Sequence, residues 1–195
     1  MSTTTGLFIS AKRLKDQTPL TGSVDDKLLV PMIKLAQDKH ILTALGTDLY
    51  NELLDLIILN YSMSTDQLTL VQEYIQPCLV QYSFAESLPT LRVRFVNHAT
   101  TIMSSEQSTA ASYEDLKPII NAAINNAQFY RQRLIDYLCD NSTLFPKYST
   151  NTGADISPES RNYYTGINVD NAYPTKDLQL ISVMSALGIK GISIC

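Results

Sequence analysis

One long segment with helical periodicity, residues 113–139, places the strongest constraint on the fold of this chain. Its apolar side chains recur every three or four residues, it contains no glycine, and its only proline, Pro118, falls near the start. Ser112 and Asp115 have the spacing of a helix-capping pair. At about 1.5 Å per residue such a helix is about 40 Å long. The sequence therefore predicts a mainly α fold, a helical bundle with a long C-terminal helix.

The same periodicity predicts three helices earlier in the chain. Ser23 can cap the first, in which Pro31 either produces a kink or marks the true start. Gly46 is expected to end this helix as a left-handed cap, and the second helix follows at once. The third begins at Ser64, which has capping-box spacing with the glutamine three residues later, and Pro77 interrupts its periodicity and is expected to kink it.

Residues 91–103 change from helical spacing to alternation, which predicts a short β-hairpin. Apolar residues would face one side of its first strand, and Arg92 and Arg94 the other. Two guanidinium groups on one face can bind phosphates, or carboxylates of a neighbouring subunit. Three interpretations stay open for this pair: a subunit contact, a surface facing DNA, or a solvated strand face.

These patterns divide the chain into an N-terminal leader (1–23), a helical core (24–140) and an extended C-terminal arm (141–195). Residues 6–22 are expected to be irregular. Only eight of the 55 residues of the arm are charged, whereas tyrosine, asparagine and serine are frequent up to Pro174 and the end is apolar and strand-like. We expect this arm to become ordered against a partner. Its candidate partner-binding residues are Tyr148, Tyr163, Tyr164, Tyr173, Ile189, Ile192 and Ile194.

Composition excludes several classes of protein. A 45% hydrophobic content is enough for a packed core, and a net charge of −4 gives no general attraction to nucleic acid. The longest aliphatic run, Leu56–Leu59, is far too short to span a membrane, and no secretory signal is expected. The three cysteines form no CxxC pair, which favours reduced thiols.

No motif for catalysis, cofactor binding or metal binding stands out, so we expect a protein that is not an enzyme. The two histidines, His40 and His98, have no metal-binding spacing and are interpreted as an exposed helix residue and a turn residue. Cys78 and Cys139 lie on apolar helix faces and are expected in the core. Other polar or aromatic sets receive structural interpretations: a solvated face for Asp48, Glu52 and Asp55, surface charges for Arg131 and Arg133, and helix contacts for Tyr130 and Tyr137.

Specific motifs between residues 8 and 148 resemble a known family. They are Phe8-Ile9-Ser10, Thr18-Pro19-Leu20, Asp26-Lys27, Pro31-Met32-Ile33, Ala36-Gln37, His40-Ile41, Leu45-Gly46-Thr47-Asp48-Leu49-Tyr50, Gln128-Phe129-Tyr130-Arg131-Gln132-Arg133-Leu134-Ile135-Asp136-Tyr137-Leu138 and Phe145-Pro146-Lys147-Tyr148. Together they resemble the head-to-tail connector (adaptor, or ring) proteins of tailed bacteriophages, in the version seen in phages of Bacteroides-type hosts, including crAss-like ones.

The resemblance implies a structural virion protein, made in the cytoplasm of the bacterial host and located at the portal vertex of the virion neck. Such a protein forms a homo-oligomeric ring of twelve copies that joins the portal protein of the DNA-filled head to other neck or tail proteins. The ring surrounds the genome channel, where non-specific contact with DNA is possible. The family supplies no catalytic residue, cofactor or membrane contact. A stand-alone helical protein–protein interaction module is the alternative, and it predicts a monomer.

Overall fold

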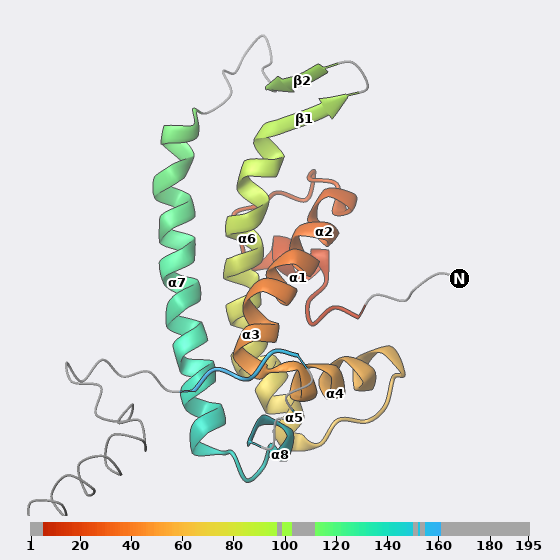
Figure 1. The fold of residues 1–195 in the computed structure, drawn as a ribbon. Helices are drawn as coiled ribbons and strands as arrows, with labels where there is room; N and C mark the ends of the chain where they lie inside the picture. The colour runs from red at the N-terminus through yellow and green to blue at the C-terminus, as the bar shows by residue number, and fades with distance from the viewer. Residues whose placement is uncertain (1–5, 97–98, 103–111, 150–151, 153–154, 161–195) are drawn as a thin grey trace, which may run out of the picture. The chain divides into compact units, whose positions relative to one another are not determined.

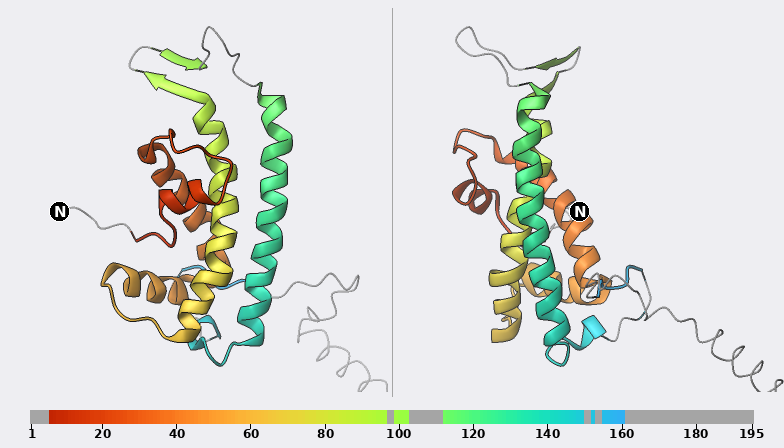
Figure 2. Two further views of the ribbon diagram at one scale, coloured as in Figure 1. Left: turned by 180° about the vertical axis from the view of Figure 1, so that it is seen from behind. Right: turned by 90° about the vertical axis from the view of Figure 1, so that its left-hand side faces the viewer.

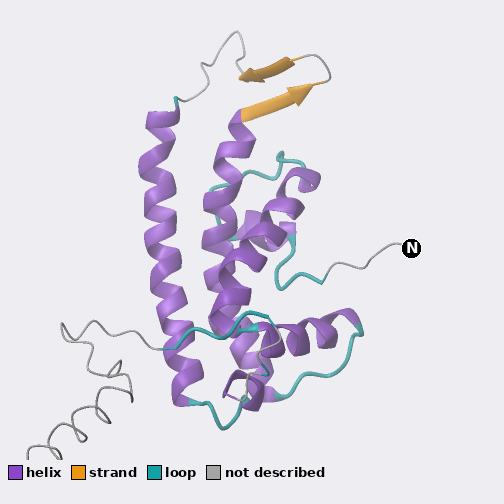
Figure 3. Ribbon diagram, in the orientation of Figure 1, coloured by secondary structure: helices purple, strands orange, loops and turns teal. Residues whose placement is uncertain are grey.

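The chain divides into two compact units, Met1–Arg161 and Asn162–Cys195. The computed structural model describes residues 6–96, 99–102, 112–149, 152 and 155–160, all in the first unit (Figure 1). The described part is mainly helical, as predicted (Figure 3). No helix within it is both long and apolar enough to cross a membrane.

Helical segments account for most of the described elements. They are α1 (Ala11–Asp16), α2 (Asp26–Ala36), the π-helical turn η1 (Gln37–Ile41), α3 (Leu42–Leu45), α4 (Thr47–Ile58), α5 (Thr65–Thr69), the π-helical turn η2 (Leu70–Ile75), α6 (Gln76–Arg92), α7 (Tyr113–Asp140) and α8 (Pro146–Ser149). Two short strands, β1 (Val93–Val96) and β2 (Ala99–Ile102), pair antiparallel, with Val93 opposite Ile102.

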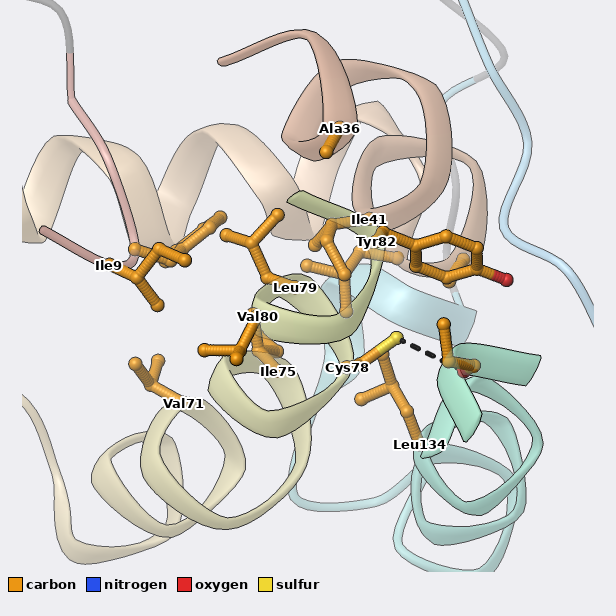
Figure 4. Close-up of a cluster of buried hydrophobic side chains, with 14 of the residues drawn as sticks. Ile9, Ala36, Ile41, Val71, Ile75, Cys78, Leu79, Val80, Tyr82 and Leu134 are labelled. Atoms are coloured by element: carbon orange, nitrogen blue, oxygen red, sulfur yellow. Dashed lines mark hydrogen bonds between the residues drawn. The ribbon is translucent and has the colours of Figure 1, made fainter. Parts of the chain in front are cut away.

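The long helix α7 lies side by side with α6 and antiparallel to it (Figures 1 and 2). Its predicted capping box is confirmed, because the Asp115 N–H donates to Ser112 Oγ and the Ser112 N–H donates to the Asp115 carboxylate. The small residues Ala123 and Ala127 are buried on α7. The Cys78 thiol of α6 donates to the Ala127 carbonyl across 3.7 Å, the dashed line in Figure 4. Small side chains therefore let the two helices approach closely.

The predicted third helix is confirmed and continues past Pro77, since it runs from α5 through η2 into α6, while the kink expected at Pro77 stays a prediction. Within η2 the pattern shifts by one residue, so that the Gln76 N–H donates to the Val71 carbonyl. Pro77 has no N–H to offer the Glu73 carbonyl. The Arg133 guanidinium of α7 donates to that carbonyl instead, at 3.4 Å. Arg133 is therefore more than a surface charge, although its side chain is exposed.

Aromatic rings reinforce the lower part of the α6–α7 pair. Tyr74 of η2 and Tyr137 of α7 stack with their centroids 4.0 Å apart, and the Arg133 guanidinium lies 4.6 Å from the Tyr74 ring centre. The predicted helix contact of Tyr137 is confirmed. Tyr130 has an edge contact with Phe129, its neighbour on the same helix.

The irregular N-terminal leader expected over residues 6–22 is wrong in part. Residues Ala11–Asp16 form α1, and the Ser10 hydroxyl caps it by accepting from the Arg13 N–H. Phe8, Ile9 and Leu14 are buried in the main core. The short apolar patch before α1 thus belongs to the bundle, because it inserts between helices that sequence periodicity alone does not bring together.

The next helix, α2, starts at Asp26 with Asp25 as its N-cap, so the expected cap at Ser23 is wrong. Pro31 lies inside α2 and does not mark its start. Gly46 has a φ of +75° and separates α3 from α4, which confirms the predicted turn. The capping box at Ser64 is also present.

Two predicted boundaries move. Helix α6 continues to Arg92, so Arg92 does not share a strand with Arg94 as the alternation predicted. The core also extends past residue 140, since α8 and Phe145 are part of it and Tyr148 is only 7% exposed. Tyr148 therefore lies in the protein's own core and not on an arm. The remaining candidates, His98, Tyr163, Tyr164, Tyr173, Ile189, Ile192 and Ile194, lie outside the described residues.

Leu134 offers a direct test of this packing. It is fully buried on α7 near Cys78 of α6 (Figure 4). Replacing Leu134 with alanine is expected to lower the free energy of unfolding by about 2–5 kcal/mol, because a cavity forms at the helix interface. Asn125→Ala, on the exposed face of the same helix, should change it by less than about 0.5 kcal/mol. Equal denaturant midpoints for the two variants would show that this interface is not packed as described.

Candidate functional site

Residues 155–160, here called the strap, lie across the corner between α3 and α4 (Figure 1). The Thr47 N–H donates to the Ile156 carbonyl, and the Ile156 N–H donates to Thr47 Oγ1, both at 3.0 Å. This reciprocal pair fixes the strap to the first residue of α4. The two residues are 109 apart in the sequence, so no local pattern predicts their contact.

Glycine is needed at position 46, at the same corner, both for the turn and for the close approach of the strap. Its positive φ is a conformation that other residues adopt only with strain. In addition, a Cβ at this position would lie 2.7 Å from Cδ of Pro158 and 2.8 Å from the Pro158 nitrogen. The sequence indicated the turn, whereas the close approach of the strap is a second reason for glycine here.

The sequence predicted a solvated face for the acidic residues Asp48, Glu52 and Asp55 of α4. Two of them instead bind other segments of the chain. Asp48 accepts two hydrogen bonds from Thr152, from its N–H at 2.7 Å and from its hydroxyl at 3.1 Å. Glu52 accepts from Gln67 at 3.0 Å and lies 3.6 Å from the Lys147 ammonium. Only Asp55 of the three fits the solvated interpretation, since its side chain is exposed. Two of the three carboxylates therefore hold other segments in place.

Arg131 of α7 holds the far end of the strap. Its guanidinium forms an ion pair with Glu159 and donates to Thr43 Oγ1 at 3.1 Å. The Tyr148 hydroxyl donates to the Glu159 carbonyl at 2.5 Å. Arg131 is thus a half-buried connection between α7, α3 and the strap, and its interpretation as a surface charge is wrong.

His40 lies in the same region and is half-buried, not exposed. Its ring stacks on Tyr82 of α6 with centroids 3.6 Å apart and an interplanar angle of 5°. Its Nε2 is 3.6 Å from the Glu86 carboxylate, which also binds the Lys39 ammonium at 2.7 Å. Burial lowers the pKa of His40, Glu86 opposes this effect, and the cations Lys39 and Arg131 add to the lowering.

These groups hold chain segments together and offer little reactive chemistry. Burial raises the pKa of the Cys78 thiol to about 12, so the thiolate needed for nucleophilic attack is disfavoured. The predicted core position of Cys78 is confirmed, and Cys139 is half-buried. Within the described ranges, no three histidine, cysteine or acidic side chains gather in a way that could hold a metal ion.

Residues 41–158 match the model of a protein family described as a family of unknown function (DUF6712). The matched range covers more than half of the chain, which therefore belongs to this family. It contains both the Gly46 corner and the strap as far as Pro158. No curated protein and no solved structure matches the sequence.

The strap predicts different behaviour for two truncated chains. A chain ending at Arg161 keeps the strap, whereas a chain ending at Tyr148 loses it and leaves Arg131 without the Glu159 carboxylate. We expect the shorter chain to be less stable by about 1–3 kcal/mol, because several hydrogen bonds and an ion pair are lost. Urea unfolding of both chains measures this difference. Coincident unfolding curves would mean that the strap does not stabilise the domain.

His40 predicts a pH dependence of stability. Its pKa is lower in the folded chain than in the unfolded chain, so the unfolded chain binds this proton more tightly. The stability contribution is therefore complete above the ordinary histidine pKa and is lost as pH falls towards the lowered value. We expect His40→Gln to lose less stability than the natural chain between about pH 7.5 and about pH 5. Parallel losses in thermal unfolding would contradict this assignment.

Proposed function

We propose that this protein is a structural component of a phage neck, forming a ring that joins the portal of the DNA-filled head to the tail. The sequence motifs that resemble connector proteins support this proposal. A second support is that the polar groups of this helical domain mainly form hydrogen bonds and ion pairs between segments of the domain itself. The virion neck is accordingly the proposed location, with the portal protein and other neck proteins as partners.

The observation that carries the proposal is the exposure of Phe129, at 66%, within the longest of those motifs. Phe129 follows the buried Ala127 by two residues, which places it about 200° around the helix, on the side of α7 away from α6. Burying an aromatic side chain of this size stabilises an association by about 1.5–3 kcal/mol. An exposed phenylalanine therefore favours a covering partner.

A second apolar surface lies on another helix. Leu28 and Leu35 of α2 are 49% and 47% exposed, and their spacing of seven residues puts them on one helix face. A closed ring of identical copies needs two different patches, because each copy meets its two neighbours through opposite sides. Phe129 on α7 and the leucine pair on α2 supply two such patches.

The hairpin and the C-terminal arm are the finer parts of the proposal. Arg92 at the end of α6 and Arg94 on β1 are candidate contacts with a neighbouring subunit or with DNA in the channel. The arm, now beginning after Arg161, would extend to a neighbouring subunit or another neck protein. Repetition of one weak arm contact around a ring makes the whole attachment durable.

Phe129→Ser tests the ring. We expect the variant to unfold at the same denaturant concentration as the natural chain, because the side chain is outside the core. Assembly, followed by particle mass with and without the portal protein of the same virus, should need at least about a tenfold higher concentration. Gln128→Ala, the exposed neighbour in the same motif, serves as the control and should assemble normally.

Two outcomes would contradict the proposal. Unchanged assembly of the Phe129→Ser variant would remove the observation that carries it. A natural chain that stays monomeric at every concentration, even beside the portal protein, would favour the stand-alone interaction module.

A further inference from the structure

Two glutamine side chains form a cradle around the N-terminal segment Gly6–Ile9. Gln37 is the first residue of η1, and Gln76 is the first residue of α6, directly after η2. Gln37 therefore begins one π-helical turn, and Gln76 directly follows the other. At such turns the helix departs from its regular spacing. The cradle, Gln37 with Gln76, is defined by these two residues.

The cradle forms hydrogen bonds with the backbone of the segment. The Phe8 N–H donates to Gln37 Oε1 at 2.9 Å, and Gln37 Nε2 donates to the Gly6 carbonyl at 3.2 Å. On the other side, Gln76 Nε2 donates to the Phe8 carbonyl at 2.8 Å. Three backbone polar groups between Gly6 and Phe8 are thus paired by two side chains.

Further hydrogen bonds fix the orientation of the Gln37 side chain. It is fully buried, and its Nε2 also donates to the Tyr50 hydroxyl at 2.9 Å. The Tyr50 hydroxyl in turn donates to Asp38 Oδ1 at 2.7 Å, and Asp38 pairs with Lys34. This chain of bonds fixes the orientation of the Gln37 amide, because its oxygen must point at the Phe8 N–H. A buried amide with its partners satisfied in this way is a built recognition site.

Apolar contacts define which peptide fits. Phe8 and Ile9 are each only 3% exposed, and the Phe8 ring meets the Tyr50 ring edge-on with centroids 5.7 Å apart. A Cβ on Gly6 would lie 2.9 Å from Cγ1 of Ile58. The preferred ligand is therefore a peptide that bends at a large aromatic and aliphatic pair and has glycine two positions before the aromatic residue.

The segment leads directly into α1, and the two together are joined to α2 by a linker, residues 17–25. None of its side chains is buried, and a Cβ on Gly22 would meet no atom within 4 Å. Its nine residues can span up to about 30 Å when extended. The segment, moving together with α1 and its buried Leu14, can thus reach the matching position on an adjacent copy and form the same contacts there. Exchange of an identical element between copies costs little for this reason.

We propose that the cradle is a peptide-binding site for the N-terminal segment of a second copy of this chain. In an isolated chain it is filled by the chain's own residues 6–9, and in an assembly it exchanges that segment with a neighbour. The inference rests on the proposed ring for the closeness of the copies. Its chemistry rests only on the contacts of Gln37 and Gln76.

Cysteine pairing across the cradle tests the exchange. Gly6→Cys and Ile58→Cys are made in separate full-length chains, both with Cys139→Ser and Cys195→Ser. The two chains are unfolded together, refolded at high concentration and oxidised. The short distance from the Gly6 Cβ position to the Ile58 side chain is compatible with a disulfide. We expect a covalent dimer of the two chains, at least about tenfold above either chain alone.

The controls separate the exchange from chance contact and from the ring. Gly22→Cys mixed with Ile58→Cys should give at least about tenfold less dimer, because no Ile58 atom lies within 4 Å of the Gly22 Cβ position. One chain carrying both Gly6→Cys and Ile58→Cys should link internally, which shows that the geometry permits the bond. If that chain links internally while the mixed chains give no dimer, the exchange is overturned. A separate measurement of particle mass tests whether the ring forms. The proposed ring and the proposed exchange of the segment can therefore fail independently.

Discussion

Everything in the described domain depends on the close packing of α7 against α6. Ala123 and Ala127 permit this approach, and the Cys78 thiol meets the Ala127 carbonyl across the contact. Helix α6 also receives α2 on another face, so it contacts most of the core. Larger residues in place of the two alanines would push the helices apart. Arg133 would then lose its contact with the Glu73 carbonyl, and Arg131 its contact with the strap.

The two ends of the domain are fixed by a different kind of interaction. The N-terminal segment is bound through its backbone by glutamine side chains, and the strap through its backbone by Thr47. Both contacts join residues far apart in the sequence, and at the N-terminal segment the buried Phe8 and Ile9 add apolar area to the hydrogen bonds. They hold residues 6–9 and the strap at defined points of the domain.

Sequence patterns predicted the features that depend on local chemistry. The length of α7, the capping boxes at Ser112 and Ser64 and the turn at Gly46 follow from residue type and spacing alone. The strap, the burial of His40 and the inserted Phe8 do not, because each depends on a partner distant in the chain. Pro77 is an example: Arg133, 56 positions later, donates to the Glu73 carbonyl one turn before the proline, a contact that no local pattern reveals.

The central claim is that copies of this domain form a neck ring, and a cryo-EM map of the virion neck tests it most directly. The account predicts the α6–α7 helix pair repeated around the portal axis, with the Phe129 side of one copy covered by the α2 side of the next. A neck in which no ring contains this helix pair, or a virion without this chain, would contradict it.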